Sequence, residues 1–509
     1  MELMIDGHHL VLDDVIDVAR NRRRIALSDE AKEKIRKAEQ MVKDFVEQGK
    51  VSYGITTGFG KFSDTLISKE ETGELQRNLI MSHAVGVGDP FSEEIVRAMM
   101  LLRINSLSQG FSGIRLSTLE TLVNMLNRDV YPLVYEKGSL GASGDLCPLA
   151  HMALTLIGEG EAFLNGKRVP SKAAMEAAGI KPVVLSAKEG LSLINGTQAM
   201  CAVGCITAYD ALQASKLADI SVALSMEALE GIRDAFDARV HAVRPHSGQI
   251  HTADNVRDLL DGSERITNQG EKRVQDAYVL RCAPQVHGAC KDAIRHVVEK
   301  LEIEINSVTD NPILFVEDEY AISGGNFHGE SVAMAFDYLG IAISELANIA
   351  ERRVERLVNP ALNNDLPAFL TPKGGLNSGF MIVQYAAAAL VSENKVLAHP
   401  ASVDSIPSSA NQEDHVSMGT IAARKAQDIL KNTQDVLAME MLCSTQAIDL
   451  QENGKLGKGT QPAYETIRKA VPFFEEDTVF YPFIHQIADM IHDGSLLAAV
   501  EHTCTLKEV

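Results

Sequence analysis

The chain has 509 residues, of which 45% are hydrophobic and 23% are charged, a globular composition that excludes wholesale disorder. Lysine and arginine number 48 against 69 aspartate and glutamate residues, which gives a net charge of -21. This balance disfavours binding to the phosphate backbone of nucleic acids, which requires a basic face, and binding to anionic membrane surfaces. The composition therefore suits a soluble enzyme that acts on small molecules.

Two short hairpins are predicted in the first part of the chain. Leu3-Met4-Ile5 and Leu10-Val11-Leu12 flank Asp6-Gly7, a pair typical of a tight turn. The segment 162–169 repeats this pattern around Asn165-Gly166. Other strand signals are few, and loops are concentrated before residue 200. The sequence thus predicts a loop-rich N-terminal region over residues 1–195.

Long helices are predicted after this region, in stretches that lack proline. They cover residues 206–229, 339–357, 381–398 and 421–443. Apolar residues in the second of these follow helical spacings of three and four, and Asn359-Pro360 ends it. We expect a mainly α protein with a long-helix bundle and C-terminal helical region over residues 196–509. The two regions are expected to form one interlocked body.

Cysteine usage and the N-terminus indicate the compartment. The seven cysteines form no C-x-x-C pair, so reduced thiols in a cytoplasmic protein are expected. The N-terminus lacks the basic and apolar regions of a signal peptide, and no apolar run approaches the roughly 20 residues of a membrane span. Neither H-E-x-x-H nor a Cys/His ligand spacing occurs among the 15 histidines, so no metal site is expected.

The most informative segment is Ala142-Ser143-Gly144. A flexible loop that leads into a helix near Pro148 is the simplest interpretation. The residues also permit a reaction, because Gly144 has no Cβ and its nitrogen can approach the Ala142 carbonyl closely. Ring closure and dehydration of Ser143 would give an imidazolone with an exocyclic methylene, an electrophile that no standard side chain provides. A helix that begins near Pro148 would place its positive end beside this ring.

Six ordered blocks carry a family resemblance that covers nearly the whole chain. The central block is 141–151, and the others are 53–60, 193–197, 275–282, 323–329 and 409–415. Together they resemble the aromatic amino-acid ammonia-lyases, which form 4-methylidene-imidazole-5-one (MIO) from Ala-Ser-Gly. The resemblance implies an MIO made from Ala142, Ser143 and Gly144 with no external cofactor, a helical fold of the aspartase/fumarase-like lyase type, and a homotetramer whose active sites each combine three subunits.

The resemblance also implies roles for single residues. Tyr53 would be the base for the β-proton, and Arg281 would bind the substrate carboxylate, which a guanidinium fork matches. Tyr278 would handle the substrate amino group, and its place three residues before Arg281 lets a helical turn point both the same way. Asp276-Ala277-Tyr278 departs from the Asp-Pro-Tyr of many members, which affects loop rigidity but removes no functional group. Four further residues are expected to orient the MIO and the substrate or to line the pocket: Asn195, Gln275, Phe327 and Met381.

Ser82-His83 and Glu413 indicate the substrate. Ser-His resembles the histidine-specific branch of the family, whereas branches for phenylalanine and tyrosine usually carry Phe-Leu and His-Leu. His83 can hydrogen-bond an imidazole. In the histidine-specific branch a glutamate at the position of Glu413 faces the imidazole or amine. The resemblance therefore implies conversion of L-histidine to trans-urocanate and ammonia, the first step of histidine degradation.

Two alternatives remain open. An MIO aminomutase, or an ammonia-lyase for another aromatic amino acid, would share the core motifs, but Ser82-His83 and Glu413 argue against it. A catalytically silent helical-bundle structural protein is the other, and the intact Ala142-Ser143-Gly144, Tyr53 and Arg281 argue against that. The Gly-Ser-Ser-x-Met-Pro-x-Lys signature of the fumarase and aspartase lineage does not occur.

Overall fold

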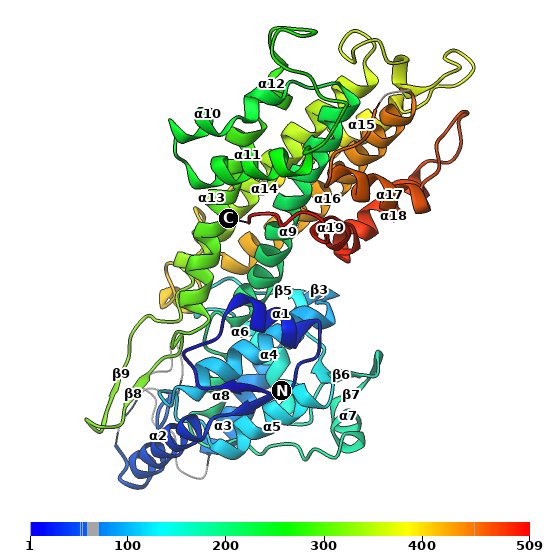
Figure 1. Cartoon of the computed structure of the whole chain (residues 1–509). Coiled ribbons are helices and arrows are strands. Elements are labelled where there is room, and N and C mark those ends of the chain that lie inside the picture. The colour runs from blue at the N-terminus through cyan, green and yellow to red at the C-terminus, as the bar shows by residue number, and fades with distance from the viewer. Residues whose placement is uncertain (1, 51, 53, 59–70, 452–453, 509) are drawn as a thin grey trace. The chain divides into compact units, whose positions relative to one another are not determined.

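The computed structural model describes residues 2–50, 52, 54–58, 71–451 and 454–508. Nineteen α-helices lie within these residues, joined by short strands, which confirms the predicted mainly α fold. The chain forms two compact units (Figure 1). The first comprises Met1–Tyr209, Val298–Asp337 and Pro400–Arg424, and the second comprises Asp210–Val297, Tyr338–His399 and Lys425–Val509. The expected division at residue 195 stays a prediction.

The first unit surrounds a central helix that is buried on every side. In α4 (Glu93–Ser108) each residue from Ile95 to Ser108 is buried, so no face of this part of the helix is exposed to solvent. Ser28 begins α2 with a side-chain cap, in which its Oγ accepts from the Ala31 N–H at 3.1 Å. The other helices of this unit are α1 (Leu12–Ala19), α2 (Asp29–Glu47), α3 (Thr72–His83), α5 (Leu116–Asn127), α6 (Leu146–Leu156), α7 (Ser171–Ala177) and α8 (Glu189–Ile194).

The strands of the described residues all lie in the first unit and form small sheets. Parallel β1 (Leu3–Ile5) and β2 (Ile25–Leu27) form one, and antiparallel β3 (Val87–Pro90) and β5 (Tyr135–Lys137) form another. A third has the order β4 (Val130–Pro132), β6 (Glu161–Leu164), β7 (Lys167–Pro170), and β8 (Ile313–Phe315) pairs with β9 (Tyr320–Ile322).

One predicted hairpin is confirmed and the other is wrong. The β6–β7 hairpin turns at Asn165 and Gly166, whose φ angles of 52° and 71° suit the predicted tight turn. At the N-terminus, however, Leu3 pairs with Ile25 in a parallel register, and Leu12 begins α1. The physical reason is the Asp6 side chain, whose Oδ1 accepts from the N–H groups of His8 at 2.8 Å and His9 at 3.2 Å. These donors are thereby satisfied without a returning strand.

The long helices predicted after residue 195 are confirmed. They are α9 (Gln198–Ala228), α14 (Glu330–Val358), α15 (Met381–Leu397) and α16 (Gly419–Asp449), and α14 ends directly before the predicted stop at Asn359-Pro360. A fifth long helix is α13 (Ala283–Glu304). By length and composition α14 could cross a membrane, but 67% of its most apolar window is buried inside the protein. A core helix passes the same test, so α14 is explained by the packing seen here.

The second unit has one large apolar core. Side chains from α9, α14 and α16, such as Val222, Leu346 and Leu442, pack together in it. The three helices are labelled in Figure 1. Around them lie α10 (Ala238–Ala242), α11 (Ser247–Leu259), α12 (Tyr278–Arg281), α17 (Thr460–Ala470), α18 (Tyr481–His492) and α19 (Ser495–Glu501).

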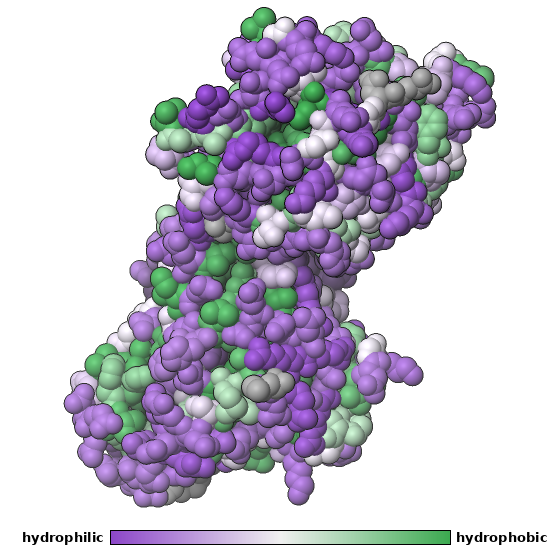
Figure 2. Space-filling view, in the orientation of Figure 1, coloured by the Kyte–Doolittle hydropathy of each residue, from purple (hydrophilic) through white to green (hydrophobic). Residues whose placement is uncertain are grey.

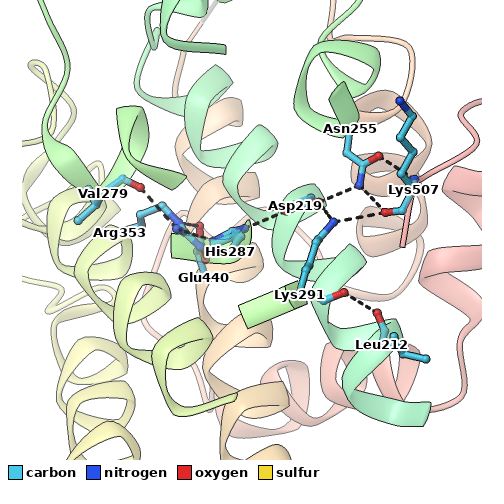
Figure 3. Close-up of polar contacts among 10 residues, drawn as sticks. Leu212, Asp219, Asn255, Val279, His287, Lys291, Arg353, Glu440 and Lys507 are labelled. Atoms are coloured by element: carbon cyan, nitrogen blue, oxygen red, sulfur yellow. Dashed lines mark hydrogen bonds and ion pairs between the residues drawn. The ribbon is translucent and has the colours of Figure 1, made fainter. Parts of the chain in front are cut away.

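A charged network is buried inside this apolar core (Figure 3). The fully buried Asp219 carboxylate accepts from Lys291 Nζ at 2.6 Å and Asn255 Nδ2 at 2.9 Å, and lies 2.9 Å from His287 Nδ1. Burial opposes ionisation of this carboxyl, but Lys291 and His287 outweigh it and hold the pKa of Asp219 below its ordinary value. The network ties α9, α11 and α13 together through directional contacts.

The surface shown in Figure 2 is largely hydrophilic, in keeping with the charged composition. Apolar side chains are nevertheless exposed on α15, where Ile382 and Tyr385 are each 59% and Val396 is 73% exposed. A groove of about 550 Å³ lies beside them, lined by residues of α14 and α15 that include Ile341 and Val391. An amphipathic helix buries its apolar face, so this face of α15 is left uncovered by the residues that the structure describes.

Candidate active site

The Ala142-Ser143-Gly144 turn is held against the segment that follows α8. Gly144 and Gly196 form a parallel bridge, in which the Asp145 N–H donates to the Gly196 oxygen at 2.7 Å and the Gly196 N–H to the Ser143 oxygen at 3.3 Å. Gly144 has a φ of 71°, and a Cβ built on it would lie 2.1 Å from the Gly196 oxygen. Only glycine therefore fits this position.

Asp145 anchors the turn from the buried side. Its carboxylate accepts from Ser139 Oγ and the Met200 N–H, each at 2.7 Å, and from Thr420 Oγ1. Burial raises the pKa of the Asp145 carboxyl above its ordinary value, although these hydrogen bonds oppose the rise. α6 begins at the next residue, Leu146, as predicted near Pro148. The positive end of this helix consequently lies beside Ser143 and Gly144.

A cavity of about 230 Å³ opens on this turn. Of the predicted site residues, Ala142, Gly144, His83 and Glu413 line it together. Ser143 Oγ donates to Glu413 Oε1 at 3.3 Å. The remaining lining residues are Ser82, Val85, Gly138, Ser139, Leu140, Leu146, Cys147 and Ser408. The volume lies below the roughly 300–1,000 Å³ typical of sites for drug-sized ligands, so the cavity suits a smaller molecule.

His83 and Glu413 place an imidazole and a carboxylate in the lining of the same cavity. His83 ends α3, and its Nδ1 lies 3.0 Å from Ser82 Oγ. Burial lowers the pKa of His83, and the Leu79 carbonyl and the Glu413 carboxylate offset this only in part. Glu413 is held by Ser408 Oγ, which donates to its Oε2 at 3.0 Å. The cavity thus offers a neutral imidazole and a carboxylate to the same ligand.

A histidine that no sequence motif singled out holds the backbone just after His83. His151, on α6, accepts the Gly86 N–H at Nε2 over 2.9 Å, and burial lowers its pKa. A Cβ on Gly86 would lie 3.0 Å from the same nitrogen. His151 therefore positions the backbone just after His83. Its place in the block 141–151 was the only signal for it in the sequence.

Asn195 belongs to a buried charged network that the sequence motifs also did not indicate. Arg103 Nη1 donates to the main-chain carbonyl oxygen of Asn195 at 2.8 Å and to Gln198 Oε1 at 2.6 Å. Asn195 Nδ2 donates to Asp310 Oδ1 at 3.2 Å, and Lys188 Nζ donates to Asp310 Oδ2 at 2.7 Å. Burial lowers the pKa of Arg103 to about 10. The network fixes the backbone that pairs with the Ser143-Gly144 turn, and the role expected for the Asn195 amide stays a prediction.

The second unit holds four further predicted site residues: Gln275, Tyr278, Arg281 and Met381. Tyr278 and Arg281 share α12, where the guanidinium carbon of Arg281 lies 4.6 Å from the centre of the Tyr278 ring. Both side chains therefore point the same way, as predicted. Tyr278 is 71% exposed. Arg281 Nε donates to the main-chain carbonyl oxygen of Asp276 at 2.9 Å. Met381, half-buried, begins α15.

None of these four residues lines the 230 Å³ cavity, and neither does Phe327. Gln275 lines a separate cavity of about 420 Å³ in the second unit, together with Arg273, Asp276 and Arg356. Phe327 is half-buried in the first unit, between β9 and α14. Tyr53 lies outside the described residues.

Solved structures share this fold over essentially the whole chain. The histidine ammonia-lyase from Trypanosoma cruzi is 41% identical with a TM-score of 0.92, and the alignment covers 99% of this chain and 96% of that one. The tyrosine aminomutase from Streptomyces globisporus is 38% identical with a TM-score of 0.96, and both chains are covered completely. The fold and the turn at Ser143 therefore define the class of ammonia-lyases and related aminomutases.

The family follows from the sequence comparison. The family model for aromatic amino acid lyases matches residues 10–469, and the chain belongs to this family. A histidine ammonia-lyase from Alkaliphilus oremlandii is 62% identical over 506 residues, which cover 99% of this chain and all of that protein. One from Caldanaerobacter subterraneus is 60% identical over 97% of both chains. Members of the family use an MIO group, which the resemblance at Ala142-Ser143-Gly144 had implied.

Proposed function

We propose that this protein is an ammonia-lyase that converts L-histidine to trans-urocanate and ammonia. The observation that carries the proposal is the cavity in which the Ala142-Ser143-Gly144 turn, His83 and Glu413 meet. It is supported by relatives named histidine ammonia-lyase that match the chain from end to end.

The proposed electrophile is an MIO formed from the chain itself. The Gly144 nitrogen bonds to the Ala142 carbonyl carbon, the carbonyl oxygen leaves as water, and Ser143 loses a second water. The fit rests on Gly144, whose missing Cβ allows the approach to Gly196, and on the start of α6 beside it. Once formed, the group supplies an electrophile that activates the substrate for loss of ammonia.

Other residues of the chain are proposed to remove the β-proton and to bind the substrate. Tyr53 accepts the β-proton, for which the phenol pKa of about 10 must fall. The carbon–nitrogen bond breaks as the double bond of urocanate forms, and ammonia leaves. Arg281 binds the substrate carboxylate through its fork of donors, and Tyr278, stacked on it, handles the amino group. Asn195, Gln275, Phe327 and Met381 complete the set proposed to orient or enclose the substrate.

His83 and Glu413 are proposed to select the substrate. A neutral His83 can accept or donate one hydrogen bond to the substrate imidazole, and its lowered pKa favours that neutral form. Glu413 can accept from the imidazole N–H or the amine. A phenyl ring offers neither a donor nor an acceptor to these two side chains, so binding it would forgo both hydrogen bonds.

We further propose a cytoplasmic homotetramer with active sites shared between copies. The support is the uncovered apolar face of α15 and the exposed Tyr278 on α12, both of which a second copy would cover. The free cysteines, six of them buried, favour a reducing compartment. Light scattering on the purified protein should give four copies per particle. A monomer that turns over histidine would contradict this assembly.

Product analysis tests the proposed reaction. The purified protein is incubated separately with L-histidine, L-phenylalanine and L-tyrosine, and urocanate and ammonia are measured together. Urocanate and ammonia should form in equal amounts from histidine only. Ser143→Ala should lose nearly all activity, and Ser117→Ala, an exposed serine of α5, should keep it. A β-amino acid formed without release of ammonia would instead establish the aminomutase alternative, and turnover of phenylalanine would refute the proposed selectivity.

A further inference from the structure

We propose that His328, Glu330 and His415 form a binding site for a divalent transition-metal ion of the zinc class. Each residue offers one ligand atom, and the three atoms all lie within 4.8 Å of one another. Two of the ligands flank Gly329 at the start of α14, and the third follows Glu413 in the segment before α16. All three belong to the first unit, so the cluster is defined within one compact body.

The spacing of the two imidazoles suits a shared metal ion. His415 Nδ1 lies 3.4 Å from His328 Nε2, and the two rings stack at 28° with centroids 5.5 Å apart. Two nitrogens bound at about 2.0–2.1 Å to a tetrahedral zinc ion lie about 3.3–3.4 Å apart, which agrees with this separation. A direct hydrogen bond between the rings would be long, since such bonds normally span about 2.7–3.2 Å.

The glutamate gives an independent indication of a ligand. Glu330 Oε2 is buried and, among the described residues, has no hydrogen-bond partner. An unsatisfied carboxylate oxygen away from water is costly, and a bound cation removes that cost. Glu330 is also fixed in place, because it begins α14 and the preceding Gly329 is buried against Met200.

The donor set determines the class of ion. Two imidazole nitrogens and one carboxylate oxygen are borderline ligands that suit zinc and neighbouring divalent ions better than calcium or magnesium. Three protein ligands leave a tetrahedral ion one open position, and the exposed His415 keeps that position accessible to water. Sequence spacing did not reveal the site because its two histidines are 87 residues apart.

The ion would connect two segments of the proposed active site. Phe327 precedes His328, and Glu413 lies two residues before His415. A metal bridge would hold the Glu413 segment against the start of α14 and so restrict the carboxylate that accepts from Ser143 Oγ. This consequence rests on the proposed function, whereas the binding of the ion does not.

Zinc binding to the full-length protein tests the inference directly. The protein is stripped with a chelator and dialysed, and zinc chloride is titrated calorimetrically without histidine, which itself chelates zinc. The wild-type protein should show one site per chain that His328→Gln, His415→Gln and Glu330→Gln each weaken. The loss should exceed the roughly 10–100-fold that removal of an outer-shell partner costs at metal sites. The exposed His246→Gln is the matched control and should bind zinc as the wild type does.

The outcomes separate this inference from the proposed reaction. Circular dichroism confirms that each variant is folded, and urocanate formation is measured in parallel. Absence of a stoichiometric zinc site in the wild type would overturn the proposal, as would unchanged affinity in His328→Gln and His415→Gln. Neither result touches the lyase activity. Zinc binding by a protein that does not turn over histidine would sustain the metal site and refute the proposed function.

Discussion

Replacement of Gly144 by alanine tests the geometry of the proposed MIO turn. At a φ of 71°, a side chain costs about 1–2 kcal/mol by itself. The added Cβ would also lie 2.1 Å from the Gly196 oxygen, so the bridge between Ser143-Gly144 and Gly196 must open. Its two backbone hydrogen bonds contribute about 0.5–1.5 kcal/mol each. We expect Gly144→Ala to lower the free energy of unfolding by about 2–5 kcal/mol.

Gly166 provides a control with the same backbone angle. Its φ is also 71°, but no atom in the described part of the chain lies within 4 Å of a Cβ built on it. Gly166→Ala should therefore cost only the conformational part, about 1–2 kcal/mol. Urea unfolding measures both costs, and intact mass reports whether the turn has cyclised. Gly144→Ala should keep its full encoded mass, whereas Gly166→Ala should show the loss of two waters. Equal costs in the two variants, or a cyclised Gly144→Ala protein, would refute the reasoning.

Three further predictions concern single charged residues. Glu413→Gln removes the carboxylate proposed to accept from the substrate imidazole or amine, so kcat/KM for histidine should fall by about 10–150-fold, the equivalent of the roughly 1.5–3 kcal/mol of a hydrogen bond to a charged group. Asp414→Asn, its exposed neighbour, should leave kcat/KM unchanged in the same steady-state assay. Asp219→Asn leaves Lys291 buried without its counter-charge and should cost about 3–5 kcal/mol at pH 7 in urea unfolding. Because the pKa of Asp219 is lowered in the folded protein, the stability it provides is complete above the unfolded value of about 3.9 and is lost as the pH falls through the folded pKa. Asp219→Asn should therefore flatten the acid limb of a stability–pH profile, and an unchanged limb would contradict this assignment. Arg281→Lys keeps the charge but loses the fork, so KM for histidine should rise; an unchanged KM and kcat would remove Arg281 from carboxylate binding.

Local patterns predicted the helices well because helix formation depends on neighbouring residues. The apolar period along α14 and the stop at Asn359-Pro360 are visible without any tertiary information. The N-terminal turn failed for the opposite reason. Asp6-Gly7 fits a hairpin, but the Asp6 carboxylate satisfies the next backbone donors itself, and the strand pairs with residues 25–27 instead. Propensity alone does not decide between these two sets of partners.

The candidate site was predicted where motifs carry the chemistry and missed where residues act through the backbone. The family motifs pointed to both Ser143 and Glu413, although 270 residues separate these two contacting groups. His151 and Arg103, in contrast, bind a backbone N–H and a backbone carbonyl that lie 65 and 92 residues away. Nothing in the side-chain pattern marks such partners, so only the three-dimensional structure reveals these positioning residues.

The intact mass of the purified, active protein tests the central claim most directly. The account predicts that the chain is lighter than its encoded mass by two waters and that the loss maps to a peptide containing Ala142-Ser143-Gly144. Ser143→Ala has no hydroxyl to eliminate, so this variant should be inactive and should not show the loss of two waters. An active protein with the full encoded mass would contradict the account, because the proposed reaction needs an electrophile that no standard side chain provides.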